Sequence, residues 1–242
     1  MAMLLEVAAN SLASARAAQA GGAGRIELCT ALELGGLTPS YGEIALVREQ
    51  VALPLYVLIR PRAGDFLYGD DELETMRRDI AACASLGCDG VVIGVLDAEG
   101  QLDMARCRVL VDAAQGMGVT FHRAFDLVPD PLRALEDVIA LGAERLLTSG
   151  GARSAFAGAE RIRALIAQAG DRLTVMPGAG ITPGNIATVA KLTGAMELHA
   201  SAKRSHPSGM RYRPDDALDM GSGETRTDGD EVRALLAAWA AG

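Results

Sequence analysis

The chain has 242 residues, half of them hydrophobic, a length that suits one large domain or two small ones. Its formal net charge of −8 argues against nucleic acid or anionic lipid as a partner, because binding to either depends on basic patches. No apolar run reaches the roughly 18 residues that a membrane span needs, so we expect no membrane partner.

The amino-terminal segment MAMLLEVAANS has no basic start, and Glu6 interrupts its apolar run. We therefore expect a first strand there rather than a secretory signal. Four cysteines are few for this length, and no two of them stand in a CxxC pair. A reducing compartment, the cytoplasm, fits this usage best.

Eight short apolar or β-branched runs follow one another along the chain, each succeeded by a helical pattern. Glycine recurs where these helices end, as in ASLGCDGVVIG and IALGAERLLTS, because it supplies the left-handed residue that closes a helix. A capping residue precedes a first-turn proline at three places, which indicates helix starts: Thr38-Pro39, Asp130-Pro131 and Thr182-Pro183. Strands are expected near residues 4–8, 25–29, 54–60, 90–96, 119–124, 145–149, 173–177 and 196–201.

Eight parallel strands with right-handed crossovers form either an open doubly wound sheet or a closed barrel. A dinucleotide-binding sheet should carry GxGxxG after its first strand, but VAANSLASA follows Glu6 without a glycine. The sequence therefore predicts an α/β fold, a single-domain (β/α)8 TIM barrel over residues 1–242, and no nucleotide cofactor. Residues 203–229 are expected to form a long irregular loop between strand 8 and the last helix, and its role stays open.

Alternate residues of a barrel strand face the lumen, and those at the carboxyl ends form the site in essentially every characterised enzyme of this fold. Packing the apolar members of each strand against the helices turns these polar residues inward: Glu6, Glu27, Cys29, Arg60, Arg62, His122, Glu197, His199 and Ser201. The charged members could form a purely structural ion-pair network. Two imidazoles converging with them favour a working site, since a structural network rarely needs imidazole.

These residues carry the means for acid/base chemistry. A carboxylate beside an imidazole can move protons near neutral pH, and an arginine in the same cup can hold a carboxylate, a phosphate or a developing oxyanion. We therefore expect catalytic roles for Glu6, Glu27, Arg60, His122 and His199.

Anion binding is predicted for a second set of residues. Gly178 and Gly180 would let the backbone approach a ligand, and the Thr182-Pro183 helix start would direct free N–H groups toward it. Arg62 and Ser201, at the ends of strands 3 and 8, complete this set. The same glycines would also occur at any tight turn between a strand and a helix.

Among the four cysteines, Cys29 alone is expected at the active end of a strand. Cys83 and Cys107 fall within helical patterns, and Cys88 lies at the entry of strand 4, toward the opposite face. Free cysteines in such places are usually small core residues. Cu(I) selects thiolate, thioether and imidazole ligands, so Cys29 is the candidate metal ligand.

Seven motifs occur in this order along the chain: RIELC, GGLTPS, IRPRAGDFLY, VTFHRAFD, LLTSGG, PGAGI and SGMRYR. Together they resemble the CutC-type copper homeostasis family over nearly the whole length. The resemblance implies a (β/α)8 barrel, a cytoplasmic location, Cu(I) binding and self-association as a dimer or tetramer. The residues that match the family's lumen motifs are Glu6, Glu27, Cys29, Arg60, Arg62, Asp65, His122, Arg123, Asp126 and His199.

Two functions from different classes remain open. The first is copper handling, in which Cys29 binds Cu(I) together with a histidine, a methionine or a second subunit. The second is an enzyme in which Glu27 and His122 form the acid/base pair and Arg60 holds the anion of a small phosphorylated or carboxylated metabolite. A barrel that serves only as an interaction scaffold is a third reading, which the converging polar residues oppose.

Overall fold

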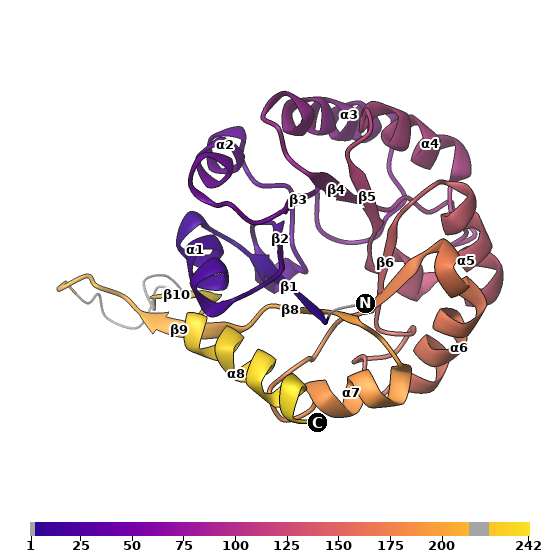
Figure 1. Cartoon of the computed structure of the whole chain (residues 1–242). Coiled ribbons are helices and arrows are strands. Elements are labelled where there is room, and N and C mark those ends of the chain that lie inside the picture. The colour runs from indigo at the N-terminus through magenta and orange to yellow at the C-terminus, as the bar shows by residue number, and fades with distance from the viewer. Residues whose placement is uncertain (1–2, 213–222) are drawn as a thin grey trace.

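The computed structural model describes residues 3–212 and 223–242. Eight parallel strands lie in the order β7-β6-β5-β4-β3-β2-β1-β8, and helices surround them (Figure 1). The strands are β1 (Leu4–Ala9), β2 (Arg25–Leu28), β3 (Leu55–Leu58), β4 (Gly90–Ile93), β5 (Gly118–Phe121), β6 (Arg145–Thr148), β7 (Thr174–Pro177) and β8 (Glu197–Ala200). The helices are α1 (Leu12–Gly21), α2 (Tyr41–Gln50), α3 (Asp70–Ser85), α4 (Met104–Ala113), α5 (Pro131–Ala140), α6 (Ala159–Ala169), α7 (Ile186–Thr193) and α8 (Gly229–Ala241). The predicted (β/α)8 barrel is confirmed.

The strand register brings charged side chains of neighbouring strands to the same height in the lumen. Glu6 of β1 is paired with Arg25 of β2 on one side and with His199 of β8 on the other. The intervening aliphatic residues, such as Leu5 and Ile26, are fully buried in the main hydrophobic core. Alternation along β1, β2 and β8 therefore separates an aliphatic layer under the helices from a charged layer inside the barrel.

Two of the three expected helix starts lie a few residues further along the chain. Helix α5 begins at Pro131 with the Asp130 side chain accepting from the Arg133 amide, as expected. Helix α2 instead begins at Tyr41, because Ser40 caps it, and α7 begins at Ile186. In both cases the Thr-Pro dipeptide belongs to the connecting loop. The Ser40 side chain accepts from the Glu43 amide at the start of α2, whereas α7 has no side-chain cap.

The stretch 203–229, expected to be irregular, contains an antiparallel two-stranded sheet formed by β9 (Lys203–Pro207) and β10 (Gly223–Thr227). The part of this stretch from 213 to 222 lies outside the described residues. The sequences of these two strands, KRSHP and GETRT, are too polar to show the apolar alternation of a core strand. The strands can be polar because they pair with each other rather than with the barrel. Figure 1 shows this hairpin extending outward beyond α1 and α8.

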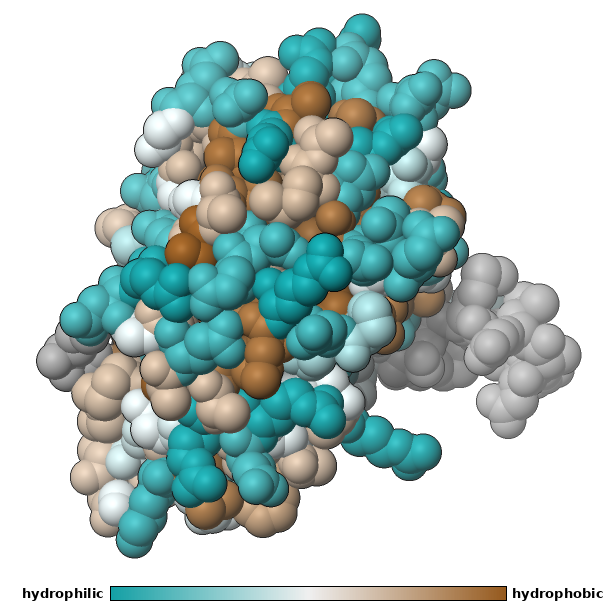
Figure 2. Space-filling view, turned by 90° about the vertical axis from the view of Figure 1, so that its right-hand side faces the viewer, coloured by the Kyte–Doolittle hydropathy of each residue, from teal (hydrophilic) through white to brown (hydrophobic). Residues whose placement is uncertain are grey.

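The side of the molecule in Figure 2 is largely covered by hydrophilic residues, with the hydrophobic patches broken up between them. Within the described residues, no helix combines the length and apolar character needed to cross a membrane.

Candidate functional site at the barrel mouth

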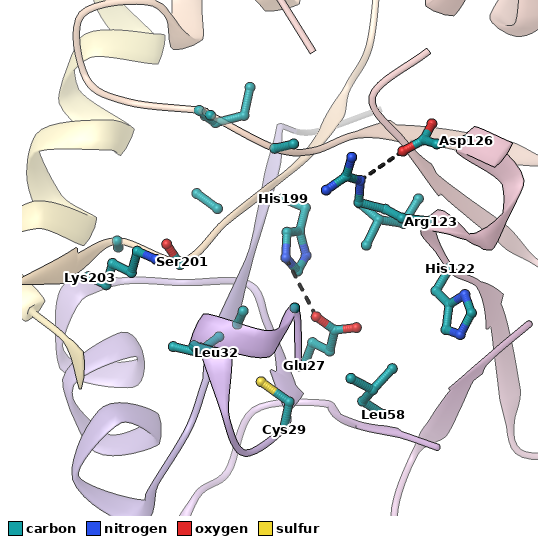
Figure 3. Close-up of a pocket in the computed structure, with 18 of the residues that line it drawn as sticks. Glu27, Cys29, Leu32, Leu58, His122, Arg123, Asp126, His199, Ser201 and Lys203 are labelled. Carbon is teal, nitrogen blue, oxygen red and sulfur yellow. Dashed lines mark hydrogen bonds and ion pairs between the residues drawn. The ribbon is translucent and has the colours of Figure 1, made fainter. Parts of the chain in front are cut away.

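A cavity of about 730 Å³ opens at the carboxyl ends of the strands. Its polar lining comes from five barrel strands or the loops that follow them, from the start of β9 and from α8: Glu27, Cys29, Arg60, His122, Arg123, Asp126, Thr182, His199, Ser201, Lys203 and Glu231. Figure 3 shows Glu27 and His199 directed toward one another inside it, with His122 on the far side of the cavity. Of the nine residues that strand parity turned inward, six line this cavity, whereas Glu6, Arg62 and Glu197 do not.

His199 stands between two buried glutamates. Its Nδ1 lies 2.8 Å from Oε1 of Glu6, and its Nε2 lies 3.5 Å from Oε2 of Glu27. Arg25 donates from Nε to the other oxygen of Glu6 and from Nη2 to Glu197, at 2.6 Å. Carboxylates and cations therefore alternate from the barrel interior up to the cavity.

The two glutamates that flank His199 have opposite electrostatic environments. Burial by itself raises the pKa of Glu6, but the hydrogen bond with His199 and the charge of Arg25 outweigh it and hold the pKa at about 2. Burial raises the pKa of Glu27 to about 7, because the charge of His199 offsets only part of the desolvation. Burial opposes the charged form of His199, yet the charges of Glu27 and Glu6 raise its pKa. Glu27 can thus take up and release a proton near neutral pH.

His122 has a different character from His199. Its Nδ1 accepts a hydrogen bond from the Ala124 amide at 3.1 Å, which places the ring proton on Nε2. That Nε2 is buried without a hydrogen-bond partner in the described structure. Burial and the charge of Arg60 lower the pKa of His122 to about 3. The predicted pair of Glu27 with His122 is therefore not a direct contact, since the imidazole beside Glu27 belongs to His199.

The two arginines after β3 have most of their donors engaged with the protein. Arg60 is buried, and its Nη atoms donate to the carbonyl oxygens of Leu34, Gly36 and Gly64 at 2.8–2.9 Å. Arg62 pairs with carboxylates of neighbouring residues at 2.5 and 2.9 Å and is not among the residues that line the cavity. The anion-holding roles predicted for both remain predictions.

The other predicted anion-binding residues divide between two positions. Gly180 and Ser201 line the cavity, and Gly180 has a positive φ of +70° directly after Ala179 at +77°. Gly178 lies lower, where a Cβ would come within 2.5 Å of Leu147 and 3.3 Å of His199. Its lack of a side chain leaves room for the His199 imidazole between β7 and β8.

Cys29 lines the cavity but is almost fully buried, in a small cluster with Tyr56, Leu58 and Val92. Burial and the charge of Glu27 raise the pKa of its thiol well above the usual range. Among the described residues that line the cavity there is no second cysteine and no methionine.

One group in the described part of the chain has at least three donors close enough to share a metal ion. Glu6, Glu27 and His199 offer ligand atoms that all lie within 4.8 Å of one another. Two carboxylates with one imidazole suit a harder divalent ion better than Cu(I).

Sequence reasoning missed two arginines that complete this lumen network. Arg25 is 2% exposed and bonds to both Glu6 and Glu197. Arg145 of β6 donates to Glu197 at 2.9 Å and to the Tyr56 hydroxyl at 3.1 Å. Both arginines are the first residues of their strands, at the end of the barrel away from the cavity. The inward direction of Arg25 could have been predicted from the sequence, because Arg25 shares the inward parity of Glu27.

Comparison with known proteins places the chain among close relatives. The sequence model of the CutC family matches residues 3–204. A family protein CutC of Xylella fastidiosa is 57% identical over 96% of this chain and 87% of its own length. Another from Xanthomonas campestris is 53% identical over 97% and 98% of the two chains.

Solved structures agree with this assignment. The crystal structure of CutC from Streptococcus agalactiae, a protein named for copper homeostasis, superposes with a TM-score of 0.79 at 32% identity, covering 82% of this chain and 98% of that one. A thiamine phosphate pyrophosphorylase from Pyrococcus furiosus shares the fold, with a TM-score of 0.61 at 17% identity over 99% and 96% of the two chains. The family-model match, the identity with these relatives and the shared barrel together show that this chain belongs to the CutC family.

Proposed function

We propose that the cavity at the barrel mouth binds a small phosphorylated or carboxylated metabolite and that Glu27 transfers a proton to or from it. The observation that carries this proposal is the state of Glu27, a buried carboxyl that borders the cavity with a pKa of about 7. A general base or acid works best when its pKa lies near the operating pH. Perturbed carboxyls in a cleft are typical of catalytic sites.

The neighbours of Glu27 support its role as the proton carrier. Arg25 keeps Glu6 ionised, and Glu6 in turn fixes the orientation of His199 through Nδ1. The Nε2 of His199 then faces Glu27 at 3.5 Å, where its positive charge can stabilise the Glu27 carboxylate. When Glu27 takes a proton from the ligand, this arrangement holds the carboxyl in place beside the imidazole.

The anionic part of the ligand is assigned to the segments that follow β7 and β8. Gly180 and Ser201 line the cavity from these two segments, and Lys203 adds an ammonium group that forms no ion pair with the described residues. Figure 3 shows Ser201 and Lys203 close together on one flank of the cavity, with Glu27 between them and His122. A phosphate or carboxylate held there by a cation and backbone amides would leave its reactive end toward Glu27.

Copper handling through Cys29 is the second candidate function. It is favoured by the presence of the Cys29 thiol in the cavity lining, together with the neutral imidazole of His122. The raised pKa of Cys29 weighs against it, because the thiolate is the metal ligand. The four cysteines are free and buried, which supports the cytoplasmic setting that either function would need.

A thermal-shift screen of phosphorylated and carboxylated metabolites tests the first candidate, since a ligand at 100 times its Kd adds about 2.7 kcal/mol of stability. Each ligand that binds is then incubated with the protein in D2O, and incorporation of deuterium into the ligand is followed by NMR. We expect Glu27→Gln to abolish this exchange while binding persists, and Lys203→Ala to weaken binding. The proposal is contradicted if no metabolite in the screen binds, or if deuterium exchange persists in Glu27→Gln.

Copper is tested in parallel with Cys29→Ser as the variant. Cu(I) is titrated anaerobically in competition with a chelator of known affinity. Loss of Cu(I) binding in Cys29→Ser, with no metabolite bound by the wild type, would favour the copper function instead.

A further inference from the structure

The turn after β5 carries a cavity residue that the proposed function does not use. The short 3-10 helix η2 (Arg123–Leu127) follows His122, whose imidazole accepts from the Ala124 amide. Phe125 of this turn is buried in the main hydrophobic core. The turn is held by its first hydrogen bond and by core packing, so its first residue, Arg123, has a defined place at the barrel mouth.

Asp126 ties the Arg123 guanidinium to the end of β6. The Asp126 side chain is 7% exposed. Its Oδ1 accepts from the Thr148 hydroxyl at 2.6 Å and from the amides of Ser149 and Gly151 at 3.0 Å. Its Oδ2 accepts from the Ser149 hydroxyl at 2.9 Å and from Nε of Arg123 at 2.7 Å. These bonds fix the direction of the carboxylate, and the carboxylate in turn orients Arg123.

One edge of this guanidinium is used by the protein, and the other is available to a ligand. Nε donates to Asp126 and Nη2 donates to the Ser149 hydroxyl at 3.2 Å, so these two atoms occupy one edge of the planar group. Nη1 forms no hydrogen bond with the residues that the structure describes. The Arg123 side chain is 45% exposed and lines the cavity. Figure 3 shows its guanidinium on the cavity side of Asp126. The second N–H of Nη2 and both N–H groups of Nη1 are therefore free for a ligand.

Arg60, the other arginine among the described lining residues, differs from Arg123 in this respect. Arg60 is buried, and both of its Nη atoms donate to carbonyl oxygens of the surrounding loops. An arginine that braces loops directs its terminal donors to the backbone in this way. Arg123 is oriented through Nε instead, which leaves its terminal edge toward the cavity.

We propose that the free edge of Arg123 binds a carboxylate of the ligand through one N–H of each Nη. This inference rests on the proposed function, which assigns an anionic group of the ligand to Ser201 and Lys203. The ligand class then becomes a small metabolite with two anionic groups, a carboxylate at Arg123 and a phosphate or second carboxylate at Lys203. Two parallel N–H groups match the two oxygens of a carboxylate. Asp126 already compensates part of the charge of Arg123, so a singly charged carboxylate suits this edge better than a phosphate.

The two subsites together would hold the ligand across the residues assigned to proton transfer. Figure 3 shows Arg123 and Lys203 on opposite sides of the cavity, with His199 between them. Glu27 faces Nε2 of His199 at 3.5 Å. A ligand anchored at both ends presents the carbon atoms that join its anionic groups to Glu27, whereas a monoanion is held at one end only. Fixing the reacting atoms in this way favours the reaction, so the site should prefer dianions.

The test compares compounds that differ by one carboxylate. Dicarboxylates from malonate to adipate are each paired with the monocarboxylate that has a methyl group in place of one carboxylate, and phosphoglycolate is paired with ethyl phosphate. The series covers a range of distances between the two anionic groups. Calorimetric titration of the full chain gives the Kd of each compound. We expect at least one dianion to bind more tightly than its monoanionic partner, by about 10–100-fold, because the charge-assisted hydrogen bonds to Arg123 are then made.

Variants of Arg123 assign this preference to its guanidinium. Arg123→Gln should weaken the dianion by about 10–100-fold and leave the monoanion unchanged. Arg123→Lys should restore only part of the loss, because lysine keeps the charge but lacks the fork. Arg77→Gln is the matched control, since it makes the same charge change in a side chain of α3 that is 47% exposed and does not line the cavity. Thermal unfolding of ligand-free Arg123→Gln checks the fold, in which Asp126 should keep its bonds to the end of β6.

The outcomes separate this subsite from the proposed function. Equal affinity for both members of every pair, or a preference for dianions that survives in Arg123→Gln, would overturn the subsite. Monoanions that bind and exchange deuterium in a Glu27-dependent way would then still support the proposed function. Exchange that persists in Glu27→Gln, together with a dianion preference lost in Arg123→Gln, would refute the proton transfer and support the subsite. A wild type that binds no compound of the series overturns the subsite as well.

Discussion

Replacing Glu27 with glutamine should make the protein more stable at pH 8 and change its stability little at pH 5. Burial raises the pKa of Glu27 from 4.5 to about 7 in the folded protein. The folded state therefore binds this proton more tightly than the unfolded chain does. Wild-type stability should fall as the pH rises from about 4.5 through about 7 and stay reduced above it.

The size of the effect follows from the same pKa. Full ionisation of a carboxyl with a pKa near 7 instead of 4.5 costs about 3 kcal/mol, at about 1.4 kcal/mol for each pH unit. Glutamine removes this cost, but His199 then loses the attractive charge of Glu27. We therefore expect Glu27→Gln to raise the free energy of unfolding at pH 8 by about 1–3 kcal/mol.

The measurement is urea unfolding of both proteins at pH 5 and pH 8, with the difference in unfolding free energy compared between the two pH values. Glu33→Gln is the matched control, because Glu33 is an exposed carboxyl in the loop after β2. That substitution should give the same small difference at both pH values. If Glu27→Gln also gave the same difference at both, Glu27 would titrate as an ordinary surface carboxyl and the proposed proton transfer would lose its basis.

Three further predictions concern the residues around the site. Glu6→Gln should lower the free energy of unfolding at pH 7 by about 3 kcal/mol, at about 1.4 kcal/mol for each unit by which the pKa of Glu6 is lowered, because the buried Arg25 then keeps only Glu197 as a carboxylate partner. In the wild type this stabilisation should be lost between about pH 4.5 and pH 2, as followed by circular dichroism. Gly178→Ala should cost about 1–3 kcal/mol in thermal unfolding, since the new Cβ would lie 2.5 Å from Leu147. Arg60→Lys should speed amide hydrogen exchange in the two loops whose carbonyl groups Arg60 binds, because lysine lacks the forked guanidinium.

The chain offers a control for each of these changes. Glu74→Gln removes a partly exposed carboxylate whose ion pairs with the described residues are all with neighbours on its own helix. Gly42→Ala adds a Cβ with no atom within 4 Å, so a loss of stability equal to that of Gly178→Ala would refute the steric argument. Arg78→Lys alters a side chain that is 75% exposed. Unchanged exchange in Arg60→Lys would show that the loops do not depend on the guanidinium.

The barrel could be predicted because its strands obey one simple rule. The alternation of aliphatic and polar residues, together with glycine at the helix ends, indicated all eight strands, and the same alternation turned Glu6, Glu27 and His199 inward. Their meeting at one height then follows from the strand register, which pairs Glu6 with His199. Parity could have identified Arg25 as well, since it lies two residues before Glu27 on the same strand.

Contacts that depend on side-chain direction could not be predicted from this rule. Parity turns both histidines inward, but it does not reveal that His122 uses Nδ1 to accept the Ala124 amide while His199 reaches Glu27. Arg60 likewise faces the lumen, yet its donors turn back to the loops. The hairpin of β9 and β10 was missed because a polar ribbon carries no apolar period.

The choice between a structural network and a working site depends on whether each buried charge is compensated. Glu6 accepts from Arg25 and His199, and its pKa of about 2 shows that its partners more than repay its burial. In a network that served only stability, we would expect the partners of every other buried carboxylate to lower its pKa as well. Glu27 is also buried, but its contact with His199 at 3.5 Å leaves the pKa at about 7. An under-compensated carboxyl beside an open cavity weakens the fold at neutral pH, and such a cost is typical of residues kept for chemistry.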